Sequence, residues 1–430
     1  MTSALATLPP GVVEAANMIR QLDDCLLHGF ARLGSQHRDS LAALAATLGG
    51  SPLEQPVAEA VSAIGRSEFL TRHFVSLAAA RAAVQGAQHD ALIAQLGEVF
   101  GVSTAEVEDP PAHSVGGSAA LLSSAEQWLM EIALAGFNQL DEDAVSPFVA
   151  TLEHLQANSE LTGVAALLTG FVNELLMYMP AERHPQLPIY RWADLWTAAM
   201  VRTQQLPGEL PYQEVSGTLT PFGLSVNSHA NFVSANLYGL LDTGETKQTV
   251  RVPLASYKVD VVAGPEVWDL FGDVGEPILK ALAGNKTLTF EHGELAANGN
   301  LLLKTKPKVS RKSDPFAAAE FLTALPSASP LFRHPVHIDH VVHLDGAAEL
   351  PLAVERLAVD TEFDEKEIKQ APEMIALMRF DQGGWRVQPL CVRTDQGIII
   401  SGGGIADARK TLKSKPLAIL KERSSKLLRA

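Results

Sequence analysis

Residues 213–224 read Gln-Glu-Val-Ser-Gly-Thr-Leu-Thr-Pro-Phe-Gly-Leu and separate two different residue patterns along the chain. Before this stretch, alanine and leucine recur every three or four positions, which places apolar side chains on one side of an α-helix. From Gln213 onward, short segments rich in valine, leucine, phenylalanine and threonine are typical of β-strands. The sequence therefore predicts a multi-domain protein, with an all-α N-terminal half followed by an α+β C-terminal half.

The N-terminal region, residues 1–205, is expected to be a helical domain. Its predicted helices lie at about 10–33, 35–49, 55–64, 67–84, 87–100, 118–138, 144–157, 160–178 and 189–205. The long polar break at 101–117 predicts a sub-boundary within this domain. Short turns between so many helices indicate either a bundle or an irregular stack of helical hairpins. No repeat of 33 to 47 residues recurs, so a regular solenoid is not expected.

The central region, residues 206–305, is predicted to be rich in β-structure. Expected strands lie at 215–224, 230–241, 248–262, 286–291 and 298–304, with a helix at 265–283 between the third and the fourth. Three strands, a helix and two further strands is the order found in the small OB-type barrel that binds oligonucleotides and oligosaccharides. Other α+β domains share this order, so the central domain is described as OB-like.

Residues 306–314 are predicted to form a basic linker, because lysine and arginine are frequent there and the first acidic residue is Asp314. Residues 315–430 are expected to be an α+β domain with a basic tail. Its predicted elements are helices at 315–324, 349–357 and 364–378, a strand at 335–344, and a hairpin at 385–394 and 397–401, followed by helical segments.

Composition excludes several classes of protein. Apolar residues make up 47% of the chain and charged residues 19%, so an intrinsically disordered protein is not expected. A formal net charge of −15 argues against DNA binding over the whole surface. Cys25 and Cys391 are the two cysteines and lie far apart in the sequence, so a fold stabilised by disulfide bonds is not expected. This favours a reducing compartment, and we expect the protein to be cytoplasmic. The apolar stretch 161–179 is interpreted as a buried helix, so no membrane association is expected.

Charge is distributed unevenly along the sequence. All fifteen lysines lie at Lys247 or later, and the first 205 residues contain nine arginines against twenty-two acidic residues, a net charge of −13. The last 25 residues carry eight basic side chains and two acidic ones. We therefore expect other proteins to be the partners, bound through the acidic helical half and the basic C-terminal tail. Nucleic acid is a less favoured partner, and the oligomeric state is not predicted.

Four histidines lie within ten residues, from His334 to His343. In a strand, His337, Asp339 and His343 would share one face, and His340 would lie on the other. The three residues sharing a face could supply ligands for zinc or another divalent metal. No histidine follows His343 to complete a larger set, and Pro335 fits the start of an edge strand, so the sequence favours an edge strand with a polar face over a metal site.

The sequence contains no complete set of catalytic residues of a familiar type. We therefore expect a non-catalytic adaptor or scaffold, with no cofactor, within a multi-protein system. The first alternative is a metal-dependent hydrolase that uses the 334–343 cluster. The second is a single-strand nucleic-acid binder that uses the central OB-like domain, although paired aromatic and basic residues are scarce there.

Overall fold

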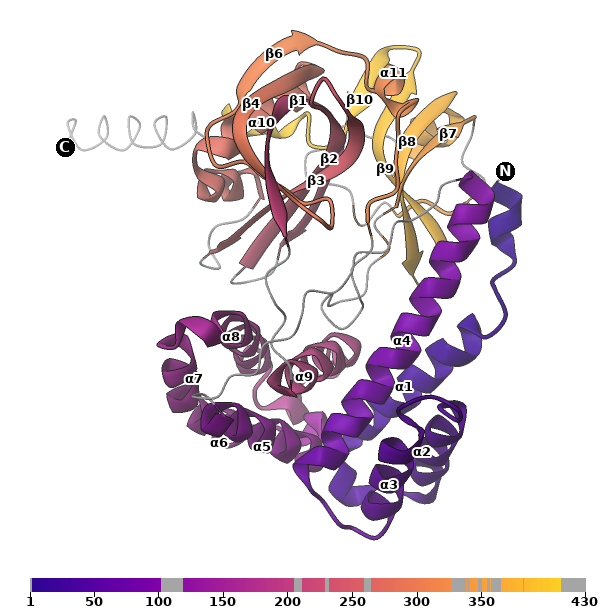
Figure 1. The fold of residues 1–430 in the computed structure, drawn as a ribbon, viewed down its shortest axis with the longest axis vertical. Helices are drawn as coiled ribbons and strands as arrows, with labels where there is room; N and C mark the ends of the chain where they lie inside the picture. Colours follow the sequence, from indigo (N-terminus) through magenta and orange to yellow (C-terminus); the bar gives the residue numbers. More distant parts are fainter. Residues whose placement is uncertain are drawn as a thin grey trace, which may run out of the picture.

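The computed structural model describes residues 2–101, 119–204, 211–228, 232–258, 264–326, 338, 340–346, 350–353, 356, 365–381 and 383–410. Its N-terminal half is helical and its C-terminal half is rich in β-sheet, which confirms the predicted order of the two parts. Figure 1 shows the helices below and two sheets above. Residues 102–117 of the predicted sub-boundary lie outside the described part of the chain.

The helices match the predicted ones in order, but the helix predicted at 144–157 is divided into a 3₁₀ helix at 146–148 and an α-helix at 149–156, and two predicted helices are joined. They are α1 (Val12–His28), α2 (Ser35–Thr47), α3 (Glu54–Gly65), α4 (Thr71–Phe100), α5 (Ala119–Ala135), α6 (Glu142–Val145), α7 (Val149–Gln156), α8 (Thr162–Leu176) and α9 (Ile189–Gln204). Short 3₁₀ helices lie at η1 (Thr2–Ala6), η2 (Phe30–Arg32), η3 (Phe137–Gln139), η4 (Ser146–Phe148), η5 (Ser159–Leu161) and η6 (Ala181–Arg183). The two helices predicted at 67–84 and 87–100 form one continuous helix, α4, because Gly86 is buried within it and packing outweighs its low helix propensity.

The helical half consists of two units with the same plan, residues 12–100 and 119–204. Each begins with a helix of 17 residues, α1 or α5. Each then passes through a three-residue 3₁₀ helix that starts with phenylalanine, Phe30 or Phe137. These phenylalanines pack edge-on against the fourth residue of the last helix of their own unit, Phe74 at 5.3 Å and Trp192 at 5.7 Å between ring centroids. Equivalent residues of the two turns lie 107 positions apart in the sequence, an interval much longer than a solenoid repeat.

The two units contact one another at their equivalent turns, Leu27-His-Gly-Phe-Ala-Arg-Leu33 and Leu134-Ala-Gly-Phe-Asn-Gln-Leu140. Gly29 has φ 88° and ψ 133°, and Gly136 has φ 90° and ψ 138°, a region that disfavours other residues. A Cβ on Gly29 would lie 2.6 Å from the Ala135 carbonyl oxygen, and one on Gly136 would lie 2.5 Å from the Gly29 nitrogen. Such reciprocal contacts are those of a two-fold relation between the units.

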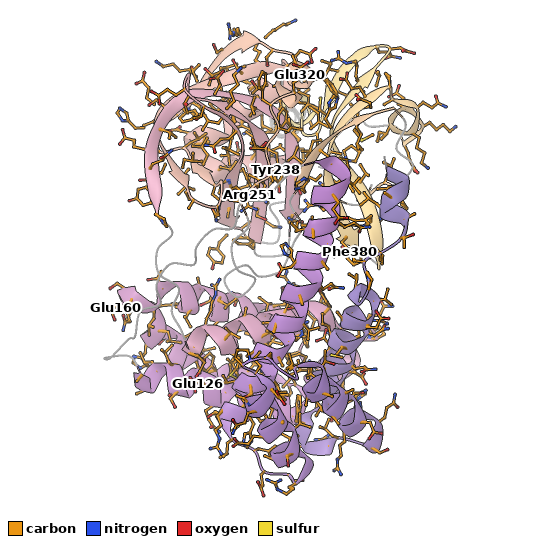
Figure 2. The ribbon with its side chains drawn as sticks, turned by 45° about the vertical axis from the view of Figure 1, so that its right-hand side comes forward. Glu126, Glu160, Tyr238, Arg251, Glu320 and Phe380 are labelled. Atoms are coloured by element: carbon orange, nitrogen blue, oxygen red, sulfur yellow. The ribbon has the colours of Figure 1, made fainter. Side chains whose placement is uncertain are left out.

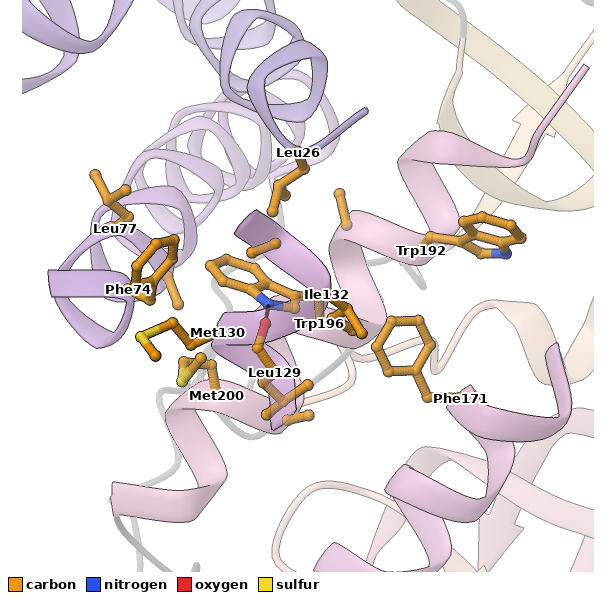
Figure 3. Close-up of a cluster of buried hydrophobic side chains, with 14 of the residues drawn as sticks. Leu26, Phe74, Leu77, Leu129, Met130, Ile132, Phe171, Trp192, Trp196 and Met200 are labelled. Carbon is orange, nitrogen blue, oxygen red and sulfur yellow. Dashed lines mark hydrogen bonds between the residues drawn. The ribbon is translucent and has the colours of Figure 1, made fainter. Parts of the chain in front are cut away.

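Large aromatic side chains fill the interior of the helical half. Trp192 and Trp196 of α9 are fully buried, and the Trp196 indole donates a hydrogen bond of 2.9 Å to the Leu129 carbonyl of α5 (Figure 3). The stretch 161–179 contains α8, whose Leu168, Phe171 and Leu175 belong to the same core. This confirms that it is a buried helix.

The first sheet has the order β3-β2-β1-β4-β5, and β6 pairs with β4 outside this path. Its strands are β1 (Tyr212–Ser228), β2 (Phe232–Asp242), β3 (Lys247–Tyr257), β4 (Lys286–Ala296), β5 (Leu301–Leu302) and β6 (Lys308–Lys312). Between β3 and β4 lie η7 (Gly264–Phe271) and α10 (Gly272–Ala283). A parallel bridge between Arg251 of β3 and Asn300 beside β5 brings the two ends of this path together, so the sheet is a nearly closed barrel. Residues 308–312 of the predicted linker thus belong to this sheet.

The second sheet has the order β10-β9-β8-β7, with β7 (His340–Asp345) at one edge. Its other strands are β8 (Glu373–Asp381), β9 (Gly384–Thr394) and β10 (Gly397–Ile400), and α11 (Pro315–Ala319) and α12 (Glu365–Gln370) precede β7 and β8 respectively. The hairpin predicted at 385–401 is confirmed as β9 and β10. The helix predicted at 364–378 is wrong beyond residue 370, because Met374–Met378 form a fully buried strand. A short apolar run of this kind does not distinguish a buried strand from a buried helix.

The two sheets share one hydrophobic core. Leu224 and Leu237 of the first sheet belong to the same buried cluster as Leu377 and Leu390 of the second. Gly223 lets the strands approach closely, because a Cβ there would lie 2.5 Å from the Leu390 carbonyl oxygen. The C-terminal half therefore packs as a continuous body from the barrel to the second sheet.

Helix α4 belongs to both halves of the molecule. Near its start, Phe74 and Leu77 are buried in the helical core. Near its end, Leu92 and Leu96 belong to a separate buried cluster that includes Val342 of β7. Figure 1 shows α4 running from the helical half up to the second sheet, beside the N-terminus. Helix α4 therefore connects the helical core to the second sheet.

Candidate functional site

The predicted histidine site is described in part. His337 and Asp339 lie outside the described residues, as does His334. His343 lies in β7, with its Nε2 atom 3.0 Å from Glu373 Oε1 and 3.6 Å from Asp345 Oδ1. The predicted edge position of this strand is confirmed. The structure thus gives His343 carboxylate neighbours other than the predicted Asp339.

Glu373 already has a cationic partner. Its second oxygen, Oε2, accepts a hydrogen bond of 2.5 Å from Arg393 Nε, and Arg393 also pairs with Asp314 at 3.0 Å. Arg393 lies over the Phe316 ring, 4.4 Å from its centroid. A metal at His343 would compete with this guanidinium for the Glu373 carboxylate. The group therefore serves to join α11 to the second sheet.

His340 occupies the opposite face of β7 and is buried, with 3% of its surface exposed. Burial lowers the pKa of its imidazole to about 4, so the ring is neutral near pH 7. Its neighbours along this face, Ile338 and Val342, belong to the cluster that meets the end of α4. Both faces of β7 are therefore packed, and His340 behaves as a core residue.

A cleft lies where the two halves of the molecule meet. Its volume is about 560 Å³, and it is lined by Ala16, Ile19 and Arg20 of α1, Gln88 of α4, Tyr190 of α9, and Phe380, Asp381 and Gly383 of the β8–β9 turn. Figure 2 shows Phe380 at the junction of the second sheet with the helices. A volume between about 300 and 1,000 Å³ at a junction of this kind is typical of ligand-binding sites.

Beneath this cleft is a buried network of charges. Arg81 of α4 is fully buried and donates from Nε and Nη2 to the Asp23 carboxylate of α1, at 2.7 and 3.1 Å. Its Nη1 atom donates to Asp194 of α9 at 2.7 Å. Gln85 also donates to Asp194, at 2.9 Å. The network joins three helices and holds two carboxylates against one guanidinium.

The network changes the protonation of the groups around it. Burial, and to a smaller extent the Asp194 carboxylate, raises the pKa of Asp23 to about 6 against the opposing effect of Arg81. Burial of the Tyr190 hydroxyl, together with Asp194, raises its pKa to about 12. Tyr190 therefore remains a neutral hydrogen-bond donor in the cleft. The residue as a whole is 56% exposed and forms part of the cleft lining.

The polar groups at the cleft wall bind one another. Arg356 forms two hydrogen bonds with Asp381, at 2.9 and 3.0 Å. Gln88 donates to the Val12 carbonyl at 3.1 Å. Among the described residues, the lining shows no nucleophile beside a base, the pairing that covalent catalysis requires.

The cleft cannot be recognised from the sequence alone, because its residues come from α1, α4, α9 and the β8–β9 turn. A signal was present in Arg81, a charged residue within the apolar, alanine-rich stretch from Phe74 to Val84. Charged side chains are rarely buried unless they are paired, so Arg81 predicts acidic partners on neighbouring helices. It does not specify which ones.

No protein-family model matches the chain, and the curated proteins and the solved structures that were compared give no significant match. In the described part of the chain, no helix has the combination of length and apolarity that crossing a membrane requires.

Proposed function

We propose that the chain is a non-catalytic protein-interaction component that receives an extended segment of a partner protein in the cleft between its halves. The observation that carries this proposal is the cleft itself, which is lined by the exposed Tyr190 together with Phe380 and Asp381. Arg20 is exposed and can donate to carbonyl groups, and the rings of Tyr190 and Phe380 offer apolar contact area. A polypeptide backbone presents both kinds of group.

Co-purification of partners with the tagged full-length chain tests this proposal. Tyr190→Ala is expected to abolish recovery of a partner that the unchanged chain retains. Tyr212→Ala is the matched control, because Tyr212 is 60% exposed on β1 and contributes nothing to the cleft lining. A partner set that is the same for all three proteins would contradict the proposal, as would turnover of a substrate by the purified chain.

We also propose, as a second candidate, that the first sheet is an OB-like barrel and binds single-stranded nucleic acid. The strand order, the helix between β3 and β4, and the parallel bridge from β3 to the start of β5 support the OB-like assignment. Lys308, Arg311 and Lys312 are exposed on β6. Binding of a labelled oligonucleotide that weakens steeply with salt would support this candidate. Binding unchanged by replacing these three residues with glutamine would contradict it.

The division into domains at 1–205, 206–305 and 315–430 remains a proposal, and limited proteolysis tests it. Cleavage confined to the intervals 205–210 and 306–314 would support these boundaries. The shared core of the two sheets favours joint protection of 206–305 and 315–410.

The hydrolase alternative rests on His337, Asp339 and His343. Stoichiometric zinc that is lost from His343→Ala would support it. A metal-free chain of unchanged stability would end it.

A further inference from the structure

A second group of metal-ligating side chains lies in the first helical unit, one turn of α1 beyond Arg20 of the cleft lining. Asp24 and His28 are four residues apart in α1, so their side chains lie on the same side of the helix. The chain then reverses through η2, and His37 follows in the first turn of α2. Fourteen consecutive residues thus bring two imidazoles and a carboxylate together.

The separations fit a single bound ion. His37 Nε2 lies 2.9 Å from Asp24 Oδ2, and His28 Nε2 lies 3.5 Å from Asp24 Oδ1. All three ligand atoms lie within 4.8 Å of one another. Zinc–ligand bonds of about 2.0–2.2 Å place neighbouring ligands of a tetrahedral ion about 3.3 Å apart. Small side-chain rotations are therefore enough to bring the three atoms onto one ion.

A residue of the second unit supports the orientation of His28. Asn138, in η3, has its amide nitrogen 3.4 Å from His28 Nδ1, and its Oδ1 atom is buried with no hydrogen-bond partner among the described residues. Exchanging the amide oxygen and nitrogen by a flip lets Oδ1 accept from His28 Nδ1–H. The lone pair of His28 then resides on Nε2, which is the atom nearest Asp24. Metal-binding histidines are commonly oriented by such an acceptor.

We propose that Asp24, His28 and His37 form a binding site for a divalent transition metal of the Zn²⁺ type, with Asn138 as a positioning residue. Two imidazoles and one carboxylate favour Zn²⁺ and its neighbours over Mg²⁺ or Ca²⁺, which prefer all-oxygen ligand sets. The Asp24 side chain is 50% exposed and that of His28 46%, which leaves a fourth coordination position to water or to a ligand from outside. Arg20, one turn earlier on the same side of α1, donates to Asn17.

The second unit provides an internal comparison. The residues 107 positions further on are Glu131, Ala135 and Ala144, so the carboxylate is retained there and both imidazoles are absent. Glu131 instead accepts a hydrogen bond from Gln127 at 3.0 Å. The proposed site is therefore specific to the first unit and is not required by the shared helical plan.

Metal titration of the full-length chain tests the proposal. After treatment with a chelator and its removal, the protein is titrated with ZnCl₂ by calorimetry and with Co²⁺ by visible absorption. We expect one tight site per chain, which is lost in His37→Ala and in Asp24→Asn. Asn138→Ala should weaken Zn²⁺ binding about 10- to 100-fold, and Asn138→Asp should restore it. Circular dichroism of each variant confirms that it is folded.

Two further variants decide between sites. His154→Ala removes an exposed histidine of α7 that belongs to neither group of potential ligands found among the described residues, and it should leave Zn²⁺ binding unchanged. His343→Ala removes a ligand of the only other group of three such residues in the described part of the chain, and it should also retain the tight site. Tight binding that survives both His37→Ala and Asp24→Asn, or that disappears in His343→Ala, overturns the proposal. Absence of saturable binding by the unchanged chain also overturns it.

Discussion

The two helical units, residues 12–100 and 119–204, have the same arrangement of elements but different charged and metal-ligating side chains. Both have the 17-residue first helix, the glycine turn, and an aromatic contact from the turn to the last helix. They differ in their charged and metal-ligating residues. Aligned on the turns, Asp23 corresponds to Met130, and aligned on the aromatic contacts, Arg81 corresponds to Ala199.

This difference separates residues that maintain the fold from residues that serve the sites. A side chain needed to pack the shared plan should have a similar counterpart in the other unit, as the turn glycines and phenylalanines do. Arg81, Asp23, His28 and His37 have none. Both the buried charge network and the proposed metal site therefore belong to the asymmetric part of the helical half.

The largest effect is expected on removing Arg81, which has no charged counterpart in the second unit. Arg81→Ala leaves Asp23 and Asp194 buried without their cation, and we expect a loss of about 3–5 kcal/mol in the free energy of unfolding. Arg72→Ala is the control on the same helix, because its pair with Glu59 is exposed and should contribute less than about 1 kcal/mol. Urea denaturation measures both, and equal losses would show that the network does not stabilise the fold.

The next prediction concerns the glycine turn, which both units contain. Gly136→Ala must adopt a positive φ and place its Cβ against the backbone of Gly29, so we expect a loss of at least about 3 kcal/mol. Gly50→Ala also has a positive φ but nothing within 4 Å of the added Cβ, and it should cost about 1–2 kcal/mol. If denaturation gave the same loss for both glycines, the close approach of the two turns would not be a source of stability.

A third test uses pH. The folded-state pKa of Asp23, about 6, is above its ordinary value of 3.8, so the folded chain binds this proton more tightly than the unfolded chain. The resulting stabilisation is present below pH about 4 and is lost, by about 2–3 kcal/mol, as pH rises to about 6. The stability of the unchanged chain relative to Asp23→Asn should fall across this window. Parallel curves, or a rising difference, would mean that Arg81 keeps Asp23 ionised at lower pH.

The smallest effect concerns the part of α4 beyond Gly86, the residue that corresponds to Gln204 at the end of α9. Trp385 of β9 donates to Gln95 of α4 at 2.9 Å, and this bond joins the two halves. A double-mutant cycle with Trp385→Phe and Gln95→Ala should give a coupling free energy of about 1 kcal/mol. A coupling free energy near zero would leave the apolar contacts of Leu92 and Leu96 as the source of attachment.

The sequence predicted the helices of the N-terminal half and most strands well, because their apolar periodicity is local. It was wrong about a helix at 349–357, where Leu352 instead forms a β-bridge with Val387 of β9. It missed β8, where both faces are buried and no alternation remains. It also missed the two-fold plan, because the similarity between the units is confined to a few residues of the turn. The cleft could not be predicted, since it depends on how distant elements meet. The group of Asp24, His28 and His37 could have been proposed from the sequence, because the spacing of Asp24 and His28 places them on one side of a predicted helix.

Helix α4 connects the two halves rigidly and passes along the cleft. Thirty residues in one uninterrupted helix span about 45 Å, with Gln88 of the cleft wall between the segments anchored at either end. The halves cannot rotate apart about a point in this helix unless its backbone hydrogen bonds break. A partner would therefore enter a cleft of nearly fixed width, and small-angle scattering should give the same radius of gyration for the chain with and without a bound peptide.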